Sequence, residues 1–153
     1  LRVSRDLDEL YQSVILDHNK TPRNFRELPP PANHADGHNP LCGDRLTVWV
    51  DVEGDTVKDV AFLGNGCAIS KASASLMTAA VKGRSRADAS ALADEFQKLV
   101  TGRLEGAAER KALGKLQALA GVSEYPVRVK CASLAWHTLK AALAGAGEPI
   151  TTE

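Results

Sequence analysis

The spacing of hydrophobic residues divides the chain into a helical start, a β-rich middle and a helical second half. Apolar residues between Leu7 and Ile15 recur every three or four positions, which predicts a one-sided amphipathic helix ending near Lys20. Alternation then predicts a strand over 45–52, and a segment rich in Val and Phe predicts a second over 57–63, joined to the first by a hairpin turn. The period becomes helical again in four stretches: from about Ser70 to Gly83, from Ser85 to Gly102, from about Ala107 to Ala120, and from Pro126 to about Ala144.

Two stretches show no such period. Residues 21–43 contain three successive prolines followed by a polar, turn-rich segment, so we predict a loop there. The tail from Gly145 onward is expected to be frayed. Two or three strands followed by helices only are typical of an α+β domain with helices packed on an antiparallel sheet. A chain of 153 residues is expected to form a single domain, 1–153.

Composition excludes several classes of protein. Nineteen basic and nineteen acidic residues give a net charge of zero, which is unlike a nucleic-acid-binding protein. No run of about 18 apolar residues is present, so we expect no membrane span. The charged stretch at 1–10 is unlike a signal peptide. Three cysteines, an odd number without an export signal, favour a reducing cytoplasm over a disulfide framework.

Each of the three cysteines lies at an end of an expected element. Cys42 precedes a strand, Cys67 follows one, and Cys131 lies close to the start of the last helix. They could be core thiols, reactive thiols or metal ligands, and their positions favour a shared site over core packing. A tetrahedral zinc site needs four ligands. Asp44 is the nearest candidate for the fourth, because Gly43 permits a tight bend beside Cys42.

The histidines compete for that fourth position. His34 and His38 lie four residues apart in the expected loop, where we interpret them as solvated. His18 is expected to end the first helix, where a cation suits the helix dipole. His137 is six residues after Cys131 on one helix and therefore faces another side.

Four separated segments resemble the U-type iron–sulfur cluster assembly proteins, the SufU/IscU/NifU N-terminal family. The resemblance covers about residues 5–144, in the expected order. The segments read YQSVILDHNKTPRN at 11–24, NPLCGD at 39–44, GNGCAIS at 64–70 and VKCASL at 129–134.

Within this family the chain is more similar to the SufU branch than to the IscU branch. IscU proteins place a histidine directly before the third cysteine, where this chain has Lys130. SufU proteins also carry an insertion before that cysteine, which the helical stretch at about 104–122 matches. The resemblance implies a small antiparallel sheet of about three strands with helices packed on one face.

The resemblance also implies a function. Cys42, Asp44, Cys67 and Cys131 would hold Zn²⁺, and a pyridoxal-phosphate-dependent cysteine desulfurase of the SufS type would pass persulfide sulfur to Cys42. Three thiolates and one carboxylate leave the zinc site with a net negative charge, which Arg128 and Lys130 could offset.

The alternative is a scaffold on which an Fe–S cluster is assembled in passing and handed to downstream assembly proteins or apo-proteins. The same four ligands could bind iron, because thiolates suit both metals. Lys130 stands where a ligand-capable histidine would be expected in the scaffold branch. We therefore favour sulfur transfer.

Overall fold

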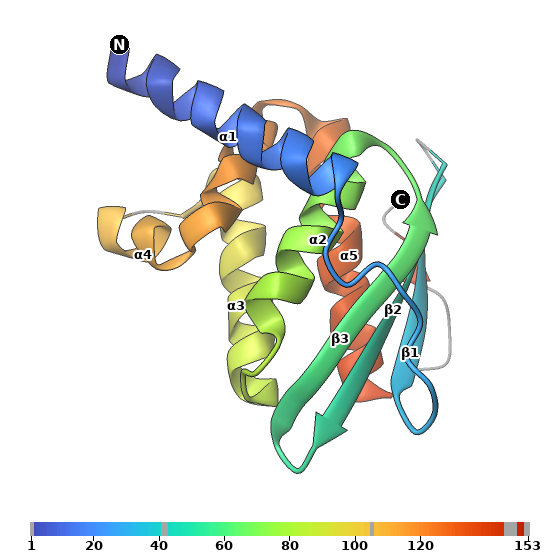
Figure 1. The fold of residues 1–153 in the computed structure, drawn as a ribbon. Helices are drawn as coiled ribbons and strands as arrows, with labels where there is room; N and C mark the ends of the chain where they lie inside the picture. The colour runs from blue at the N-terminus through green and yellow to red at the C-terminus, as the bar shows by residue number, and fades with distance from the viewer. Residues whose placement is uncertain (1, 41–42, 105, 146–149, 152–153) are drawn as a thin grey trace.

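The structure is a computed structural model that describes residues 2–40, 43–104, 106–145 and 150–151, with side chains described between 11 and 145. Figure 1 shows a sheet with helices beside it. The elements in chain order are α1 (Arg2–Lys20), β1 (Asn33–Asn39), β2 (Asp44–Glu53), β3 (Thr56–Asn65), α2 (Ala68–Val81), α3 (Arg86–Val100), α4 (Ala107–Ala112), the 3₁₀ helix η1 (Gly114–Glu124), α5 (Pro126–Ala144) and β4 (Ile150–Thr151).

The described strands form a sheet in the order β3-β2-β1-β4. The pairs β1–β2 and β2–β3 are antiparallel, which confirms the predicted sheet of three antiparallel strands and the hairpin between β2 and β3. The two-residue strand β4 adds a short parallel pairing to β1, Gly37 with Ile150 and His38 with Thr151. The expectation of a frayed tail was therefore wrong for these two residues.

The prediction of a loop throughout 21–43 was also wrong, because β1 lies within it. Its inward positions are Ala35, Gly37 and Asn39, two small residues and an amide in place of large apolar side chains. The reason is the close approach of α5: a Cβ atom at Gly37 would lie 2.1 Å from Thr138 Oγ1. Large apolar residues do not fit there, so the hydrophobic alternation that signals a half-buried strand is missing.

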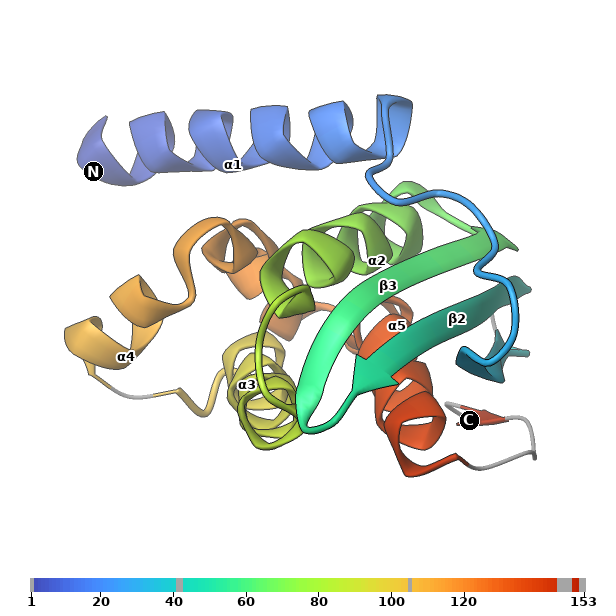
Figure 2. The ribbon, with the colours of Figure 1, turned by 60° about the horizontal axis from the view of Figure 1, so that its bottom comes forward.

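The helices cover one face of the sheet, as predicted (Figure 2). Helix α5 packs on β1 and β2, α2 packs on β3, and α1 lies across α2 and η1. At the centre of the core the rings of Phe96 and Trp136 stack with centroids 4.6 Å apart. Both side chains are almost fully buried, so they join α3 to α5 beneath the sheet.

The helical stretch after α3 differs from the single helix expected over 107–120. The structure has a short α-helix, α4, followed by the 3₁₀ helix η1. Gly114 at the junction has φ = 55°, a left-handed conformation that ends α4. Leu116, Leu119 and Val122 of η1 are buried as part of the core. The division into one domain with an insertion at about 104–122 stays a prediction.

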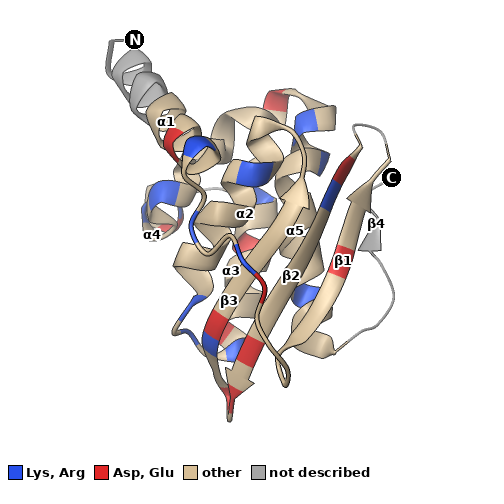
Figure 3. Cartoon of the chain, turned by 45° about the vertical axis from the view of Figure 1, so that its right-hand side comes forward, with Lys and Arg blue, Asp and Glu red and all other residues tan. Residues whose placement is uncertain are grey.

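Basic and acidic residues are interspersed along the same elements in the view of Figure 3. That distribution agrees with the balanced composition. Over the part of the chain that the structure describes, no helix combines the length and apolar character needed to cross a membrane.

Candidate metal centre

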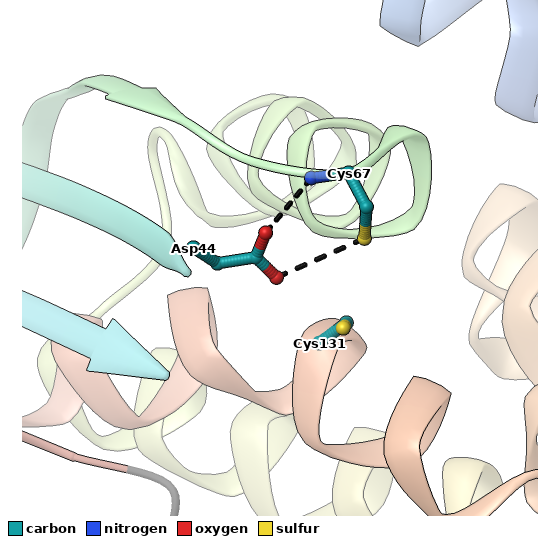
Figure 4. Close-up of side chains that lie close together, drawn as sticks. All are labelled: Asp44, Cys67 and Cys131. Atoms are coloured by element: carbon teal, nitrogen blue, oxygen red, sulfur yellow. Dashed lines mark hydrogen bonds between the residues drawn. The ribbon is translucent and has the colours of Figure 1, made fainter. Parts of the chain in front are cut away.

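Three side chains that are far apart in the sequence meet at one end of the sheet (Figure 4). Asp44 is the first residue of β2, Cys67 directly precedes α2, and Cys131 lies in the second turn of α5. One carboxylate oxygen and the two sulfur atoms all lie within 4.8 Å of one another. Strand, helix start and helix are held by separate parts of the core, so the fold itself brings these donors together.

Cys67 is the N-cap residue of α2. Its backbone is extended, with φ = −69° and ψ = 168°, and its Sγ accepts a hydrogen bond from the Ser70 N–H at 3.4 Å. The first N–H groups of a helix have no partner within the helix, and they carry a partial positive charge. The sulfur therefore lies where negative charge on a thiolate is stabilised.

The carboxylate of Asp44 is fully buried and oriented by Cys67. Its Oδ1 accepts a hydrogen bond from the Cys67 N–H at 2.8 Å, and its Oδ2 lies 3.7 Å from Cys67 Sγ. Gly66 makes this approach possible, because a Cβ atom at Gly66 would lie 2.7 Å from Oδ1 of Asp44. The glycine before Cys67 is therefore part of the site, although it offers no ligand.

Cys131 is 3% exposed and lies on the side of α5 that faces the site. Asn39 Nδ2 donates to its Sγ at 3.9 Å. Next to it, the Ala132 carbonyl accepts a hydrogen bond of 2.6 Å from Ser73 Oγ, and Ser73 in turn accepts one from Trp136 Nε1 at 3.2 Å. These buried hydrogen bonds join α5 to α2 and hold Cys131 close to Cys67.

The donor set fits a transition metal of the zinc type. Thiolate and carboxylate donors are ordinary zinc ligands. On one tetrahedral zinc ion, the usual Zn–S and Zn–O bond lengths place a sulfur and a carboxylate oxygen about 3.6 Å apart. The 3.7 Å between Cys67 Sγ and Asp44 Oδ2 is close to that separation. Three of the four predicted ligands therefore lie close together, and Cys42 lies outside the described residues.

The two basic residues predicted to support the site have different surroundings. Arg128 is exposed and its guanidinium lies over the ring of Tyr125, 4.6 Å from the centroid. Lys130 is half-buried directly before Cys131. Within the described residues neither forms a salt bridge, so neither charge is neutralised by a nearby carboxylate.

The histidines do not enter this cluster of described donors. His34 and His38 lie on β1 and not in a loop. His18 is not a solvated cation at the end of α1: it is 4% exposed, and its Nδ1 lies 2.7 Å from Ser75 Oγ. Burial, and then the nearby charge of Arg23, lower the pKa of His18. Burial likewise lowers the pKa of His137.

Sequence reasoning assigned no role to Asn39 and Gly66, although both lie in the segments that carry the family resemblance. The side chain of Asn39 reaches Cys131 across 92 positions of sequence, which no local pattern could indicate. The pair of glycines around Asn65 is a signal that could have indicated a close backbone approach, because glycine is used where a Cβ atom would collide.

Comparison with known proteins agrees with this site. The family described as NifU-like N terminal domain matches residues 10–132. The chain is 44% identical to the iron–sulfur cluster assembly scaffold protein IscU of Streptococcus pyogenes serotype M1, covering 90% of this chain and 84% of that protein. It is 42% identical to the zinc-dependent sulfurtransferase SufU of Bacillus subtilis strain 168, covering 91% and 92%.

A solved structure gives the same result for the fold. A crystal structure described as that of a candidate SUF-system scaffold protein from Fervidobacterium islandicum AW-1 superposes with a TM-score of 0.79 at 32% identity, covering 85% of this chain and 93% of that one. The match of the family over most of the chain, and two relatives above 40% identity, lead to one conclusion. This chain belongs to the family of NifU-like N-terminal domains.

Proposed function

We propose that this protein acts in iron–sulfur cluster assembly as a zinc-dependent sulfurtransferase. In this proposal Cys42, Asp44, Cys67 and Cys131 hold Zn²⁺, and Cys42 accepts sulfur from a SufS-type, pyridoxal-phosphate-dependent cysteine desulfurase. The observation that carries it is the convergence of three of these donors within 4.8 Å. The similarity to a zinc-dependent sulfurtransferase over more than 90% of both chains supports it.

Zinc, when bound, would keep its cysteine ligands deprotonated at neutral pH. The chemistry that Cys42 then performs is thiol–sulfur exchange. Its thiolate attacks the outer sulfur of the desulfurase persulfide, a new S–S bond forms on Cys42, and the S–S bond of the donor breaks. The desulfurase cysteine leaves as a thiolate, so the transfer needs no oxidant, reductant or proton.

Asp44 suits a site that must release and rebind one ligand. A carboxylate is a harder and weaker zinc ligand than a thiolate, so a mixed site exchanges more readily than one of four thiolates. The hydrogen bond from the Cys67 N–H keeps the carboxylate in place during such an exchange. Arg128 and Lys130 would offset the negative charge of the site and attract an anionic persulfide.

A cluster scaffold is the second candidate function. The name of the Streptococcus pyogenes relative, 44% identical to this chain, favours it. Thiolate donors bind iron as well as zinc, so the same residues could hold an Fe–S cluster before its transfer to apo-proteins. Lys130 next to Cys131 argues for sulfur transfer, because an ammonium group is not a metal ligand at neutral pH.

The proposed reaction belongs in the cytoplasm. Free thiols and a persulfide both need a reducing compartment. Cys67 is a free and exposed thiol in the structure. The partners would be the desulfurase on one side and downstream Fe–S assembly proteins or apo-proteins on the other.

The test combines metal analysis with the location of the transferred sulfur. The purified protein is expected to carry about one zinc ion and to stimulate the desulfurase. Mass spectrometry of peptides, after incubation with desulfurase and cysteine, should find one added sulfur atom on Cys42. The Cys42→Ala variant should abolish stimulation, and stimulation at the normal rate in this variant would exclude Cys42 as acceptor.

Anaerobic reconstitution with iron and sulfide separates the two candidate functions. A sulfurtransferase is expected to keep its zinc under these conditions. Displacement of zinc by a cluster that is then passed to an apo-protein would favour the scaffold.

A further inference from the structure

Asn39 occupies the point where β1 ends and the turn toward β2 begins. Its side chain is fully buried, with 0% of its surface exposed. Across the sheet it is paired with Asp44, one of the three clustered donors. Its carbonyl oxygen accepts a hydrogen bond from the Gly43 N–H at 2.9 Å, directly before the start of β2.

The side chain of Asn39 connects this turn to a different part of the molecule. Its Nδ2 donates to Cys131 Sγ at 3.9 Å, across 92 positions of the sequence. Asn39 therefore contacts Asp44 through the strand pairing, Gly43 through its carbonyl, and Cys131 through its amide.

Packing does not explain an asparagine at this position. The other inward positions of β1 are Ala35 and Gly37, which suit the close approach of α5. A buried amide that loses its hydrogen bonds is destabilising, so a polar residue is retained in such a place where it makes them. The partner shown here is a sulfur atom of the proposed metal centre.

We propose that Asn39 is a positioning residue that holds Cys131 as a stationary ligand of the proposed metal centre. Its N–H group shares the negative charge of the sulfur, and its backbone contacts keep Gly43 and Asp44 at a set distance from α5. This inference rests on the proposed metal centre, but it does not depend on whether that centre serves sulfur transfer or cluster assembly.

Loss of the contact between Asn39 and Cys131 should weaken metal binding more than it affects the rest of the fold. Removing residues that orient metal ligands costs 10–100-fold in metal affinity in other proteins, and we expect about the same here. Asn39→Asp keeps the shape of the side chain and removes the N–H donor. Asn39→Ala removes the donor without introducing a carboxylate that could itself bind metal.

Thr138→Val is the matched control. Thr138 is a fully buried polar residue on the same helix as Cys131, and its Oγ1 donates to the Leu134 carbonyl at 2.7 Å. The valine has nearly the same shape but lacks this hydrogen bond, which is not part of the metal centre. It therefore reproduces the loss of one buried hydrogen bond on α5 without changing the surroundings of Cys131.

The experiment measures zinc affinity by competition with a chromophoric chelator and records the thiolate-to-metal absorption of the Co²⁺-substituted protein. Both Asn39 variants should lose about 10–100-fold in affinity and shift the thiolate absorption. Thr138→Val should do neither. Circular dichroism shows whether each variant folds. If Asn39→Ala does not fold, the comparison is made with Asn39→Asp, which conserves the volume of the side chain.

Three results would overturn the inference. Unchanged affinity and absorption in both Asn39 variants would show that the amide does not act on the metal centre. An equal loss of affinity in Thr138→Val would show that the effect is one of general stability. A wild-type protein that binds no zinc would overturn the metal centre itself, and this result is distinct because all variants would then behave alike.

Discussion

The carboxylate of Asp44 accepts the backbone N–H of Cys67 at 2.8 Å, and its second oxygen lies 3.7 Å from the sulfur of the same cysteine. One donor of the cluster is thus oriented by the backbone of another. A substitution at Asp44 should consequently alter both the metal affinity of the site and the position of Cys67.

Asp44→Ala and Asp44→Asn separate these two effects. Asparagine keeps an oxygen that can accept the Cys67 N–H, whereas alanine leaves that N–H without its partner, which costs about 1–3 kcal/mol when no water replaces it. We expect both variants to bind zinc more weakly and only Asp44→Ala to lose stability in urea unfolding. Equal stability of the two variants would contradict a role for this hydrogen bond in holding Cys67.

Gly66→Ala should disturb the metal centre without adding or removing a ligand. The new Cβ atom would lie 2.7 Å from Asp44 Oδ1, so the buried carboxylate must move. We expect weaker zinc binding in the chelator competition assay. Gly121→Ala is the control, because nothing lies within 4 Å of a Cβ atom there. Equal zinc affinity of the two variants would show that the carboxylate can shift freely.

Stability should fall on acidification, because His18 is held in its neutral form. Burial lowers its pKa most; the charges of Arg23 and Lys115 lower it further, and Asp17 opposes them. The unfolded chain therefore takes up a proton first, near the ordinary value of 6.5. The contribution of His18 to stability is complete above that pH and is lost as the pH falls toward its lowered pKa.

Urea unfolding between about pH 5 and 8 measures this effect. His137, whose pKa is lowered by burial and by Lys140, contributes with the same sign. His18→Gln should flatten the pH dependence, and His34→Gln, at an exposed position, serves as the control. The experiment is best performed on zinc-free protein, since acid also protonates cysteine ligands. An unchanged slope in His18→Gln would contradict the prediction.

Phe96→Ala should reduce stability without changing metal binding. The ring is fully buried against Trp136, and such a truncation costs about 3–5 kcal/mol in other proteins. Phe25→Ala should cost less, because Phe25 is already 40% exposed and packs edge-on against Phe62. Urea unfolding of the two variants checks the order, and a Phe25 variant as unstable as the Phe96 variant would contradict it.

The sequence predicts those elements whose buried side chains are large and apolar. Strands β2 and β3 and helices α2, α3 and α5 follow from periodicity, because their inward positions carry residues such as Val48, Phe62 and Leu139. Strand β1 could not be predicted this way, since its inward positions are alanine, glycine and asparagine. The break between α4 and η1 follows from the backbone at Gly114, which hydrophobic spacing does not reflect.

The prediction of the candidate site has a different basis. Spacing alone left several interpretations of the cysteines open, and the resemblance of four segments to one family selected the ligand set. The structure brings Asp44, Cys67 and Cys131 within 4.8 Å of one another, and the ligand set itself stays a prediction. The hydrogen bonds around them could not be predicted, because Asn39 and Cys131 become neighbours only when β1 packs on α5.

The order of these donors along the chain affects how the protein is made. Cys67 becomes available early in synthesis, but Cys131 belongs to α5, which leaves the ribosome only after β1–β3 and four further helical segments. A metal ion therefore cannot template the folding of the nascent sheet through the full set of donors. In the proposed metal centre, the donors come together only when α5 docks on the sheet, so metal loading is expected to follow that step.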